Sequence, residues 1–408
     1  MTKCRVCANT NLNMFLSLGQ MPLANSFVTS NEISFEEKKY PLDVYFCNSC
    51  SLVQVIDIVP PEVMFTDYPY VTGTSQTMKN NLSELADKAS TCISLDPSDL
   101  VVDIGSNDGT LLSYFKEAGF RTLGVEPASN IAKLASDNGI ETIQAFFTQD
   151  TCSQILKSHG KAKIITGTNV FAHVDDINGF INCTKRLLHP DGMLIIEVPY
   201  LPDMLNNLEF DTIYHEHLSY FSLSALNTLF RNHNMSIVKV DRLTVHGGSI
   251  RVYIASIREQ RCPYLQELLD FETDIGIPYI RIYEKFAEEV NDLKSKLRLM
   301  LNDLKHDGKR ITGYGAPAKG NILLNYCNID NTILDCIFDN TPFKQDLFTP
   351  GTHIPVISDS KFQQTNPDYC LLLAWNYEHE ILEKEKEYLQ NGGSFIIPIP
   401  YPRLISAA

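Results

Sequence analysis

The sequence lacks any apolar run long enough to cross a bilayer, since no stretch approaches the roughly 20 apolar residues of a membrane-spanning helix. The segment Met1–Val6 is polar and leads straight into a CxxC motif, which is not the pattern of a secretory signal peptide. We therefore expect a cytoplasmic protein without a membrane partner. In that compartment most of the 11 cysteines are reduced, so paired cysteines are first interpreted as metal ligands.

Positive charge is scarce as well. The chain has 34 Lys and Arg against 49 Asp and Glu, a formal net charge of -15, and it has no basic cluster. Because contacts with nucleic-acid phosphates need such clusters, we expect no nucleic-acid partner. A small phosphorylated ligand needs only a local pocket and stays compatible with this composition.

Disordered and low-complexity stretches are also missing. Hydrophobic residues make up 44% and charged residues 20% of the sequence, which is typical of a soluble globular protein. A chain of 408 residues exceeds the size at which one hydrophobic core keeps growing. We therefore expect two or three domains, in a protein that is a monomer.

Two CxxC motifs lie within the first fifty residues. Cys4 and Cys7 form one pair, and Cys47 and Cys50 form the other. Four thiolates can surround one zinc ion as a tetrahedron, whereas a single pair would leave a redox role open. A closed set of four ligands leaves no position for a substrate, so we predict a structural zinc site.

A strand–turn–helix–strand pattern begins near residue 100. The apolar run Leu100–Gly105 predicts a buried parallel strand, Ser106–Thr110 a turn, and Arg121–Glu126 a second strand that ends in a carboxylate. Such a unit is typical of nucleotide binding, because glycines let the backbone approach the ligand and the acid bonds the ribose hydroxyls.

Two cofactors fit this unit. A dinucleotide needs a helix N-terminus for its pyrophosphate, but here Asn107 replaces a glycine and Asp108 would repel phosphate. S-adenosylmethionine (SAM) has no phosphate and carries an ammonium and a sulfonium. We predict SAM, with an unliganded Rossmann-like turn as the alternative. The residues expected to hold it are Asp103, Gly105, Asn107, Asp108, Gly109, Glu126 and Asn169.

The alternation of strands and helices continues to residue 257. It predicts strands at 162–169 and 192–198, helices at 148–158 and 175–188, and a closing antiparallel pair at 236–245 and 249–257. This alternation is typical of a doubly wound sheet, and with SAM as the predicted cofactor we interpret it as a Rossmann-like class I methyltransferase domain.

A polar cluster follows the fifth strand of this sheet. The segment Tyr214–His217 offers a phenol, a carboxylate and two imidazoles. Because neighbours in a strand or helix face apart, some of the four must be structural. Residues of these types can serve as a general base and as a hydrogen-bond donor to a developing negative charge. The alternative is a polar loop with buried histidines.

At this point the chain resembles the sugar C-methyltransferase family of antibiotic and surface-polysaccharide pathways. Members of that family act on dTDP-linked, more rarely other nucleotide-linked, keto-deoxysugars. The resemblance runs essentially the whole length of the chain. It lies in the four cysteines and in the segments Asp103–Thr110, Asn169–Val174, Tyr214–His217, His246–Arg251 and Gly313–Asn321.

The resemblance implies a SAM-dependent C-methyltransferase that acts on a nucleotide-linked keto-deoxysugar through an enolate. By position it gives the role of base to His217. The other residues expected at the reacting centre are Tyr214, Glu216, His173, Tyr68 and Tyr70. The residues expected at the substrate are His246, Gly315, Lys319, Asn321 and Asn376.

The last third of the chain predicts a second α/β unit. A long helix is expected at 279–306, then a strand at 310–314 and the small-residue turn Gly315–Asn321. Backbone N–H groups of such a turn, together with Lys319, can hold phosphate. We expect no second carboxylate-ended nucleoside unit here and assign this part the diphosphate of the nucleotide sugar. A purely structural domain is the alternative.

We therefore expect three domains. These are a zinc-binding domain at 1–70, a SAM-binding methyltransferase domain at 71–260 and a C-terminal Rossmann-like α/β domain at 261–408. The alternative enzyme is an O- or N-methyltransferase on a sugar or small metabolite, which needs no enolate. A zinc-bearing scaffold with an inactive Rossmann domain is a different class, and the glycine turn, Glu126 and the histidine cluster argue against it.

Overall fold

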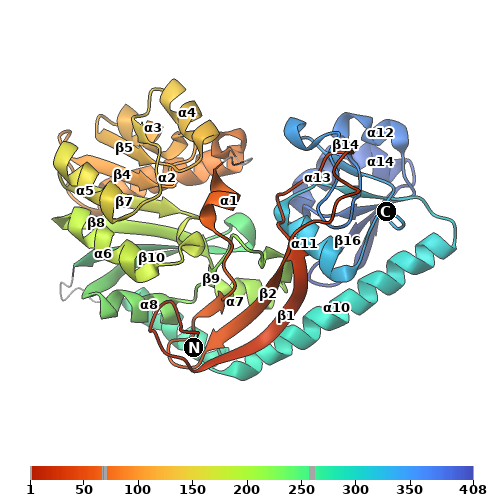
Figure 1. The fold of residues 1–408 in the computed structure, drawn as a ribbon, viewed down its shortest axis with the longest axis horizontal. Coiled ribbons are helices and arrows are strands. Elements are labelled where there is room, and N and C mark those ends of the chain that lie inside the picture. The colour runs from red at the N-terminus through yellow and green to blue at the C-terminus, as the bar shows by residue number, and fades with distance from the viewer. Residues whose placement is uncertain (1, 67, 69–70, 257–261, 408) are drawn as a thin grey trace.

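The computed structural model describes residues 2–66, 68, 71–256 and 262–407 of the chain. Their strands form three sheets, of four, seven and six strands. The seven-stranded sheet with its helices forms one lobe and the six-stranded sheet a second, while a long hairpin and a long helix connect the two (Figure 1). Among the helices in these described ranges, none is long and apolar enough to cross a membrane.

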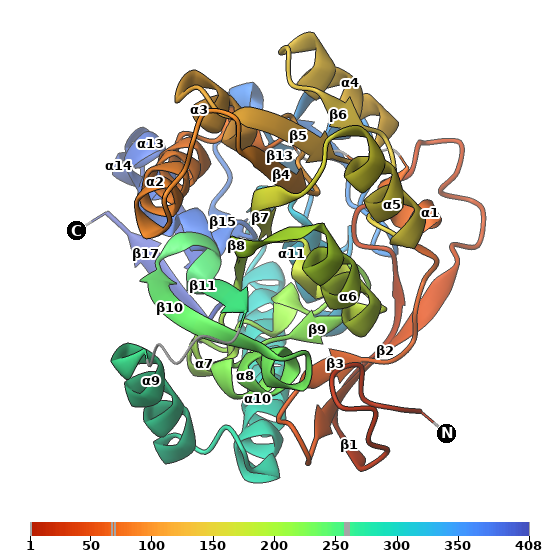
Figure 2. The ribbon, with the colours of Figure 1, turned by 90° about the vertical axis from the view of Figure 1, so that its left-hand side faces the viewer.

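The seven-stranded sheet is the doubly wound sheet predicted from the sequence (Figure 2). Its order is β10-β11-β8-β7-β4-β5-β6, and β11 runs antiparallel to both neighbours while the other pairs are parallel. Its strands are β4 (Leu100–Ile104), β5 (Arg121–Val125), β6 (Thr142–Ile143), β7 (Ala162–Thr168), β8 (Leu188–Pro199), β10 (Met235–Leu243) and β11 (Ser249–Ser256). Its helices are α2 (Gln76–Cys92), α3 (Thr110–Glu117), α4 (Ser129–Asp137), α5 (Gln149–Ser158), α6 (Ile177–Leu187) and α8 (Leu223–Asn232). Every residue of β4 is buried, which explains its almost continuous apolar run.

The six-stranded sheet has the order β14-β13-β12-β15-β16-β17, and only the β16–β17 pair is antiparallel among these described strands. Its strands are β12 (Ile311–Tyr314), β13 (Ile337–Asp339), β14 (Val356–Ser358), β15 (Tyr369–Leu372), β16 (Ser394–Ile397) and β17 (Arg403–Ser406). Its helices are α11 (Ala318–Cys327), α12 (Phe362–Thr365), α13 (Glu378–Lys384) and α14 (Lys386–Gln390). The predicted second α/β unit is therefore present.

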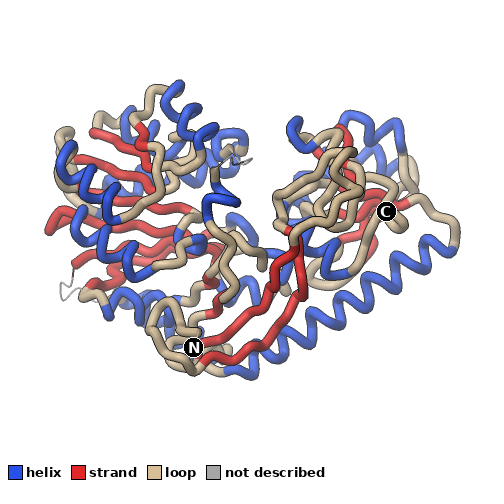
Figure 3. Tube along the Cα trace, in the orientation of Figure 1, coloured by secondary structure: helices blue, strands red, loops and turns tan. Residues whose placement is uncertain are grey.

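The four-stranded sheet has the order β1-β2-β3-β9. Its strands are β1 (Leu12–Pro22), β2 (Lys39–Cys47), β3 (Val53–Val55) and β9 (Ser219–Tyr220). Figure 3 shows β1 and β2 as two long strands that reach from the cysteine end toward the C-terminal lobe. In β1 the inward side chains of Leu16 and Leu18 alternate with exposed ones, as in a strand with one buried face.

The long helix predicted at 279–306 is α10 (Ile280–His306). Its buried side chains recur at helical spacing and pack against β1 and α11 in one apolar core that continues into the six-stranded sheet. The buried residues are Tyr283, Phe286, Val290, Leu293, Leu297 and Leu301. This core fixes the hairpin to the C-terminal lobe.

Short elements complete the described chain. They are α1 (Pro61–Phe65), α7 (Leu201–Asn206), α9 (Pro263–Asp274), η1 (Thr72–Thr74), η2 (Phe171–His173), η3 (Phe210–Thr212), η4 (Val245–Gly247), η5 (Pro342–Lys344), η6 (Asp359–Lys361) and η7 (Trp375–Tyr377). The 3-10 helices η1 to η3 each contribute residues to the lining of the cavity described below.

Candidate active site and metal centre

The four N-terminal cysteines come together as one cluster. One sulfur from each of Cys4, Cys7, Cys47 and Cys50 lies within 4.8 Å of the others, with 3.5 Å between Cys4 and Cys50 Sγ and 3.6 Å between Cys7 and Cys47 Sγ. Zinc–sulfur bonds of about 2.3 Å in a tetrahedron place the sulfurs about 3.8 Å apart. The donor set and its spacing therefore fit zinc. None of these four residues lines the cavity, which agrees with a structural ion.

A cavity of about 1530 Å³ lies between the two lobes. The first lobe lines it with Gly105, Glu126, Asn169, His173 and His217 among others, and the second with Gly315, Lys319, Asp339 and Asn376. Pockets for one small ligand span about 300–1,000 Å³. The cavity therefore has room for a cofactor and a second ligand, one on each lobe.

The glycine turn after β4 leaves its backbone open to this cavity. Gly105 has φ of +65°, and a Cβ there would lie 2.2 Å from a methyl carbon of Val170. A side chain at position 105 would thus be strained and would also clash. The glycine is required both by the turn and by close packing at the floor of the cavity.

Glu126 follows β5 and faces the same cavity. Its carboxylate accepts the backbone N–H groups of Asn107 at 3.0 Å and Ala128 at 2.9 Å. Burial raises the pKa of Glu126, and these two N–H groups oppose the rise. A carboxylate offers about four acceptor positions, so two bonds to the backbone leave capacity for a ribose diol.

The side chains of Asp108 and Asn107 bond the 3-10 helix η1 to the turn that follows β4. The Asp108 carboxylate accepts the N–H of Gly73 at 2.9 Å, and the Asn107 side-chain oxygen accepts the N–H of Thr72 at 2.9 Å. A Cβ at Gly73 would lie 2.4 Å from the Asp108 oxygen. Both residues line the cavity, and they also hold η1 against the cofactor turn.

Three further residues of the predicted cofactor set lie at different depths. Asn169 lines the cavity after β7. Asp103 also borders it, but its carboxylate accepts the hydroxyl of Thr166 at 2.6 Å, and burial raises the pKa of Asp103 to about 7. Gly109 is the N-cap of α3, with φ of +79°, and it does not line the cavity.

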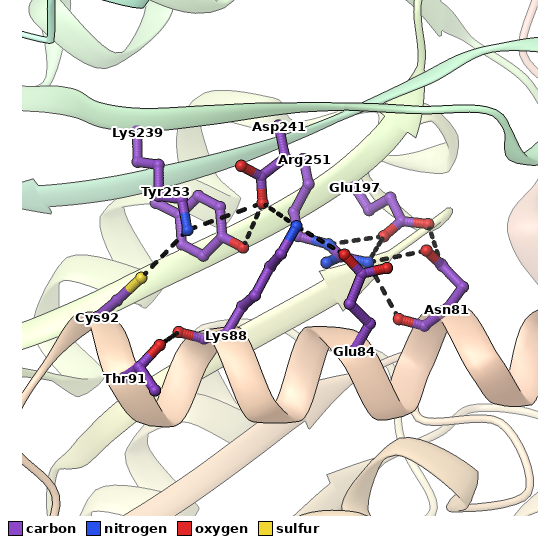
Figure 4. Close-up of polar contacts among 10 residues, drawn as sticks. All are labelled: Asn81, Glu84, Lys88, Thr91, Cys92, Glu197, Lys239, Asp241, Arg251 and Tyr253. Atoms are coloured by element: carbon purple, nitrogen blue, oxygen red, sulfur yellow. Dashed lines mark hydrogen bonds and ion pairs between the residues drawn. The ribbon is translucent and has the colours of Figure 1, made fainter.

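A buried polar network fixes α2 to the seven-stranded sheet (Figure 4). Arg251 Nε donates to Glu197 at 3.0 Å, Asn81 Nδ2 donates to Glu197 at 2.8 Å, and Arg251 also donates to the Asn81 side-chain oxygen at 2.9 Å. All three side chains are buried. Breaking a buried pair of this kind costs about 3–5 kcal/mol. Arg251 of the His246–Arg251 segment therefore has a structural role.

The histidine cluster is partly at the cavity and partly behind it. Tyr214, His217 and His173 line the cavity, with ring centroids of His217 at 4.0 Å from Tyr214 and 5.2 Å from His173. His215 points away and packs on Tyr40, with ring centroids 5.7 Å apart. Tyr214 and His217 line the cavity and His215 and Glu216 do not, because the segment is a turn in which the His217 N–H donates to the Tyr214 carbonyl at 2.8 Å.

The backbone selects the tautomer of His217. Its Nδ1 lies 2.8 Å from the carbonyl oxygen of Thr212, and because a carbonyl can only accept, Nδ1 must donate. The lone pair of the neutral ring is then on Nε2, the atom required of a general base. His173 stacks on this ring, and burial together with the nearby His217 lowers the pKa of His173 to about 3, which keeps it neutral.

Glu216 acts behind the cavity. Its carboxylate accepts the amide of Asn25 at 2.6 Å and the hydroxyl of Tyr68 at 3.1 Å, and burial raises its pKa. Tyr68 lines the cavity, whereas Glu216 does not. Glu216 therefore orients Tyr68, and Tyr70 lies outside the described residues.

Three of the five predicted substrate residues line the cavity. Gly315, Lys319 and Asn376 line the cavity on the C-terminal lobe. Asn321 is buried away from it, and its side-chain amide donates to the carbonyl of Ala24 at 2.7 Å, which ties α11 to the N-terminal hairpin. His246 lies in η4, and its side chain is outside the described part of the structure.

Asp339 corrects one expectation. We expected no carboxylate-ended nucleoside unit in the last third, but Asp339 ends β13 next to β12 and faces the cavity. Its carboxylate accepts the N–H of Ala316 at 2.6 Å and of Thr341 at 2.8 Å. The sequence predicts a strand that ends just before Asp339, but the bonds from the Ala316 and Thr341 N–H groups that make it the counterpart of Glu126 appear only in the structure.

Comparison with known proteins decides the family. Family models match as a zinc binding domain at 4–65, a methyltransferase domain at 74–240 and a C-methyltransferase C-terminal domain at 244–400. Over 407 residues, 99% of this chain and 97% of the relative, the chain is 41% identical to C-methyltransferase NovU of Streptomyces niveus. The chain belongs to the C-methyltransferase family.

Two further similar proteins match a smaller share of the chain. A ubiquinone biosynthesis O-methyltransferase of Bartonella tribocorum is 30% identical over 107 residues, which is 26% of this chain and 43% of that protein. The magnesium protoporphyrin IX methyltransferase of Synechocystis PCC 6803, solved with bound SAM, has a TM-score of 0.34 at 12% identity and covers 44% of this chain and 79% of its own.

Membership of this family confirms several predictions at once. The chain is a SAM-dependent methyltransferase with an N-terminal zinc-binding domain, a central class I methyltransferase sheet and a C-terminal α/β domain. The roles of individual side chains at the cavity stay predictions.

Proposed function

We propose that this C-methyltransferase methylates a carbon atom next to the ketone of a nucleotide-linked keto-deoxysugar. The observation that carries the proposal is the cavity itself, which has a carboxylate-ended βαβ unit on each wall and His217 between them. One unit suits the nucleoside of SAM through Glu126. The other suits the nucleoside of the acceptor through Asp339, since the resemblance to sugar C-methyltransferases implies an acceptor that is linked to a nucleotide.

The chemistry begins with a proton transfer. His217 Nε2 takes the α-proton of the sugar, and the electron pair of that C–H bond moves toward the ketone oxygen, which gives an enolate. The Nδ1–H bond to the Thr212 carbonyl stays in place and stabilises the charge that develops on the ring. A base of this kind contributes about 10²–10⁴-fold to a rate.

The enolate oxygen needs a hydrogen-bond donor. His173 is held neutral by burial and Tyr68 is oriented by Glu216, so both can donate without being strong acids. SAM, when bound, supplies a methyl group on a sulfonium. The enolate carbon would form the new C–C bond as the C–S bond of that sulfonium breaks, and the electron pair of the C–S bond would stay on sulfur. Alignment of the two ligands on facing walls provides the in-line geometry that this displacement needs.

Exchange of the α-proton with solvent deuterium isolates the first step. The enzyme would be mixed in D₂O with S-adenosylhomocysteine, which cannot transfer a methyl group, and with a dTDP-linked keto-deoxysugar. We expect deuterium at the carbon next to the ketone, and no enzyme-dependent incorporation with His217→Ala. Methylation of the sugar by the wild type without any loss of an α-proton would contradict the proposal and favour O- or N-methylation.

A further inference from the structure

The 3-10 helix η3 is held by the C-terminal lobe. Asp211, in its centre, is fully buried, and its Oδ2 accepts the indole N–H of Trp375 at 2.7 Å. Phe210 beside it packs on Tyr326 of α11, with ring centroids 5.2 Å apart. Both contacts cross from the methyltransferase lobe to elements of the C-terminal lobe.

The last residue of the same helix orients the base. The Thr212 carbonyl accepts Nδ1–H of His217 at 2.8 Å. Thr212 is itself fixed, because its hydroxyl donates to the Glu209 carbonyl at 2.7 Å and its N–H donates to the same oxygen at 3.1 Å. Only one peptide unit therefore separates the residue bonded to Trp375 from the carbonyl bonded to His217.

A cation completes this contact between the lobes. The Lys319 ammonium lies over the Trp375 ring, 4.5 Å from its centroid, and Lys319 lines the cavity. Asp211 Oδ1 is buried and has no hydrogen-bond partner among the described residues. Burial raises the pKa of Asp211 to about 6, and the charge of Lys319 and the Trp375 N–H limit the rise.

We propose that Asp211 is a positioning residue, which uses its bond to Trp375 to fix η3 against the C-terminal lobe and thereby holds the Thr212 carbonyl that sets the tautomer of His217. The proposal rests on the proposed function, in which His217 is the base. It makes the alignment of the base depend on contact with the lobe that carries the acceptor. An error of about 1 Å in such an alignment can cost about 100-fold in rate.

Matched substitutions separate this role from simple stability. Asp211→Ala and Trp375→Phe remove the bond, whereas Asp211→Asn keeps an oxygen that can accept from Trp375. We expect kcat to fall about 10- to 100-fold for the first two and within about threefold of wild type for Asp211→Asn, with SAM affinity unchanged. Glu272→Gln is the control, because Glu272 is a buried carboxylate bonded to Tyr200 and Leu223, away from η3. It should change stability without changing kcat.

Two spectroscopic signals report the contact without any turnover. Trp375 is the only tryptophan of the chain, so its fluorescence reports the bond directly and should change in Asp211→Ala more than in Asp211→Asn. Nitrogen-15 spectra of labelled histidine, assigned with His217→Gln, should show His217 protonated on Nδ1 in the wild type and a mixture of tautomers in Asp211→Ala.

The outcomes distinguish this inference from the proposed function. A shifted tautomer in Asp211→Ala supports the positioning role even if the wild type fails to exchange an α-proton, in which case only the proposed function is lost. A folded Asp211→Ala with the wild-type tautomer and the wild-type kcat overturns the inference. Equal losses of kcat in Asp211→Asn and Asp211→Ala overturn it as well, because the bond to Trp375 would then not be the cause.

Discussion

The two walls of the cavity share one backbone arrangement. On the methyltransferase lobe, the unit β4–α3–β5 ends in Glu126, which accepts two backbone N–H groups, one from the glycine turn and one from two residues downstream. On the C-terminal lobe, the unit β12–α11–β13 ends in Asp339, which does the same with Ala316 and Thr341. The first glycine of each turn has a left-handed φ, of +65° at Gly105 and +81° at Gly315.

The two turns differ in charge. The first carries Asp108, whose carboxylate is fixed by Gly73 and Thr110. The second is the small-residue segment Ala316–Ala318, and Lys319 follows it. A turn that carries an acid suits a cationic ligand without phosphate, and a turn followed by a lysine suits a diphosphate. Two walls with a similar backbone therefore differ in a few charged side chains, and on this difference we propose a different ligand for each wall.

The largest expected effect on turnover comes from replacing His217, which lies between the two walls. His217→Ala should lower turnover by about 10²–10⁴-fold, because a positioned base is lost while neither nucleoside unit changes. Steady-state kinetics with labelled SAM measures the loss, and calorimetry with SAM and with dTDP checks that both walls still bind. An unchanged turnover number would place the base elsewhere, with Tyr214 and His173 as the next candidates.

The carboxylates test the comparison itself. Glu126→Ala should weaken SAM binding about ten- to hundredfold and leave dTDP binding alone, since losing a hydrogen bond to a charged partner costs about 1.5–3 kcal/mol. Asp339→Ala should do the reverse. Glu126→Gln and Asp339→Asn are the matched controls of similar shape and should have smaller effects. If either Ala variant weakens both ligands equally, the assignment of one ligand to each wall fails.

Lys319 sharpens the contrast in charge. Lys319→Ala should raise the KM for the nucleotide sugar about tenfold, because a charged contact with the diphosphate is removed, while the Kd for SAM is unchanged. The exposed Lys386, which pairs with Glu383, provides the control substitution Lys386→Ala. An equal effect on SAM would show that the turn at Gly315 does not separate the two ligands.

The smallest expected effect on the cavity comes from the metal centre. Cys47→Ser should lower the zinc content and the thermal stability, because four thiolates are needed to close the site. Zinc would be counted by atomic absorption and stability by thermal unfolding. The fraction that stays folded should bind SAM and dTDP as the wild type does, and a selective loss of one ligand would give the metal a role beyond structure.

The sequence predicts those parts of the fold that depend on local pattern. The apolar run at Leu100–Gly105, the helical spacing in Ile280–His306 and the paired cysteines each carry their own signal, and the structure places them as expected. Because neighbouring side chains face apart, we also predict that some of the side chains of Tyr214–His217 are structural. His215 and Glu216 do not line the cavity.

Contacts between distant segments cannot be predicted in this way. Asp211 and Trp375 are 164 positions apart, and Asn321 and Ala24 are 297 apart, so nothing in the local sequence links them. Asn321 lies in a motif that resembles a binding turn, yet it supports the hairpin. Asp339 is the last residue of a strand of three residues, which is too short to show a period. In each of these positions, tertiary packing and not local pattern decides what the side chain does.

The position of the transferred methyl group tests the central claim most directly. The enzyme would be given SAM labelled with ¹³C in the methyl group and a panel of nucleotide-linked keto-deoxysugars, and the product examined by ¹³C NMR. The account predicts a labelled methyl group bonded to a ring carbon next to the ketone, with the α-proton of that carbon lost or exchanged. A labelled methyl group on oxygen or nitrogen, with the α-proton retained, would contradict it.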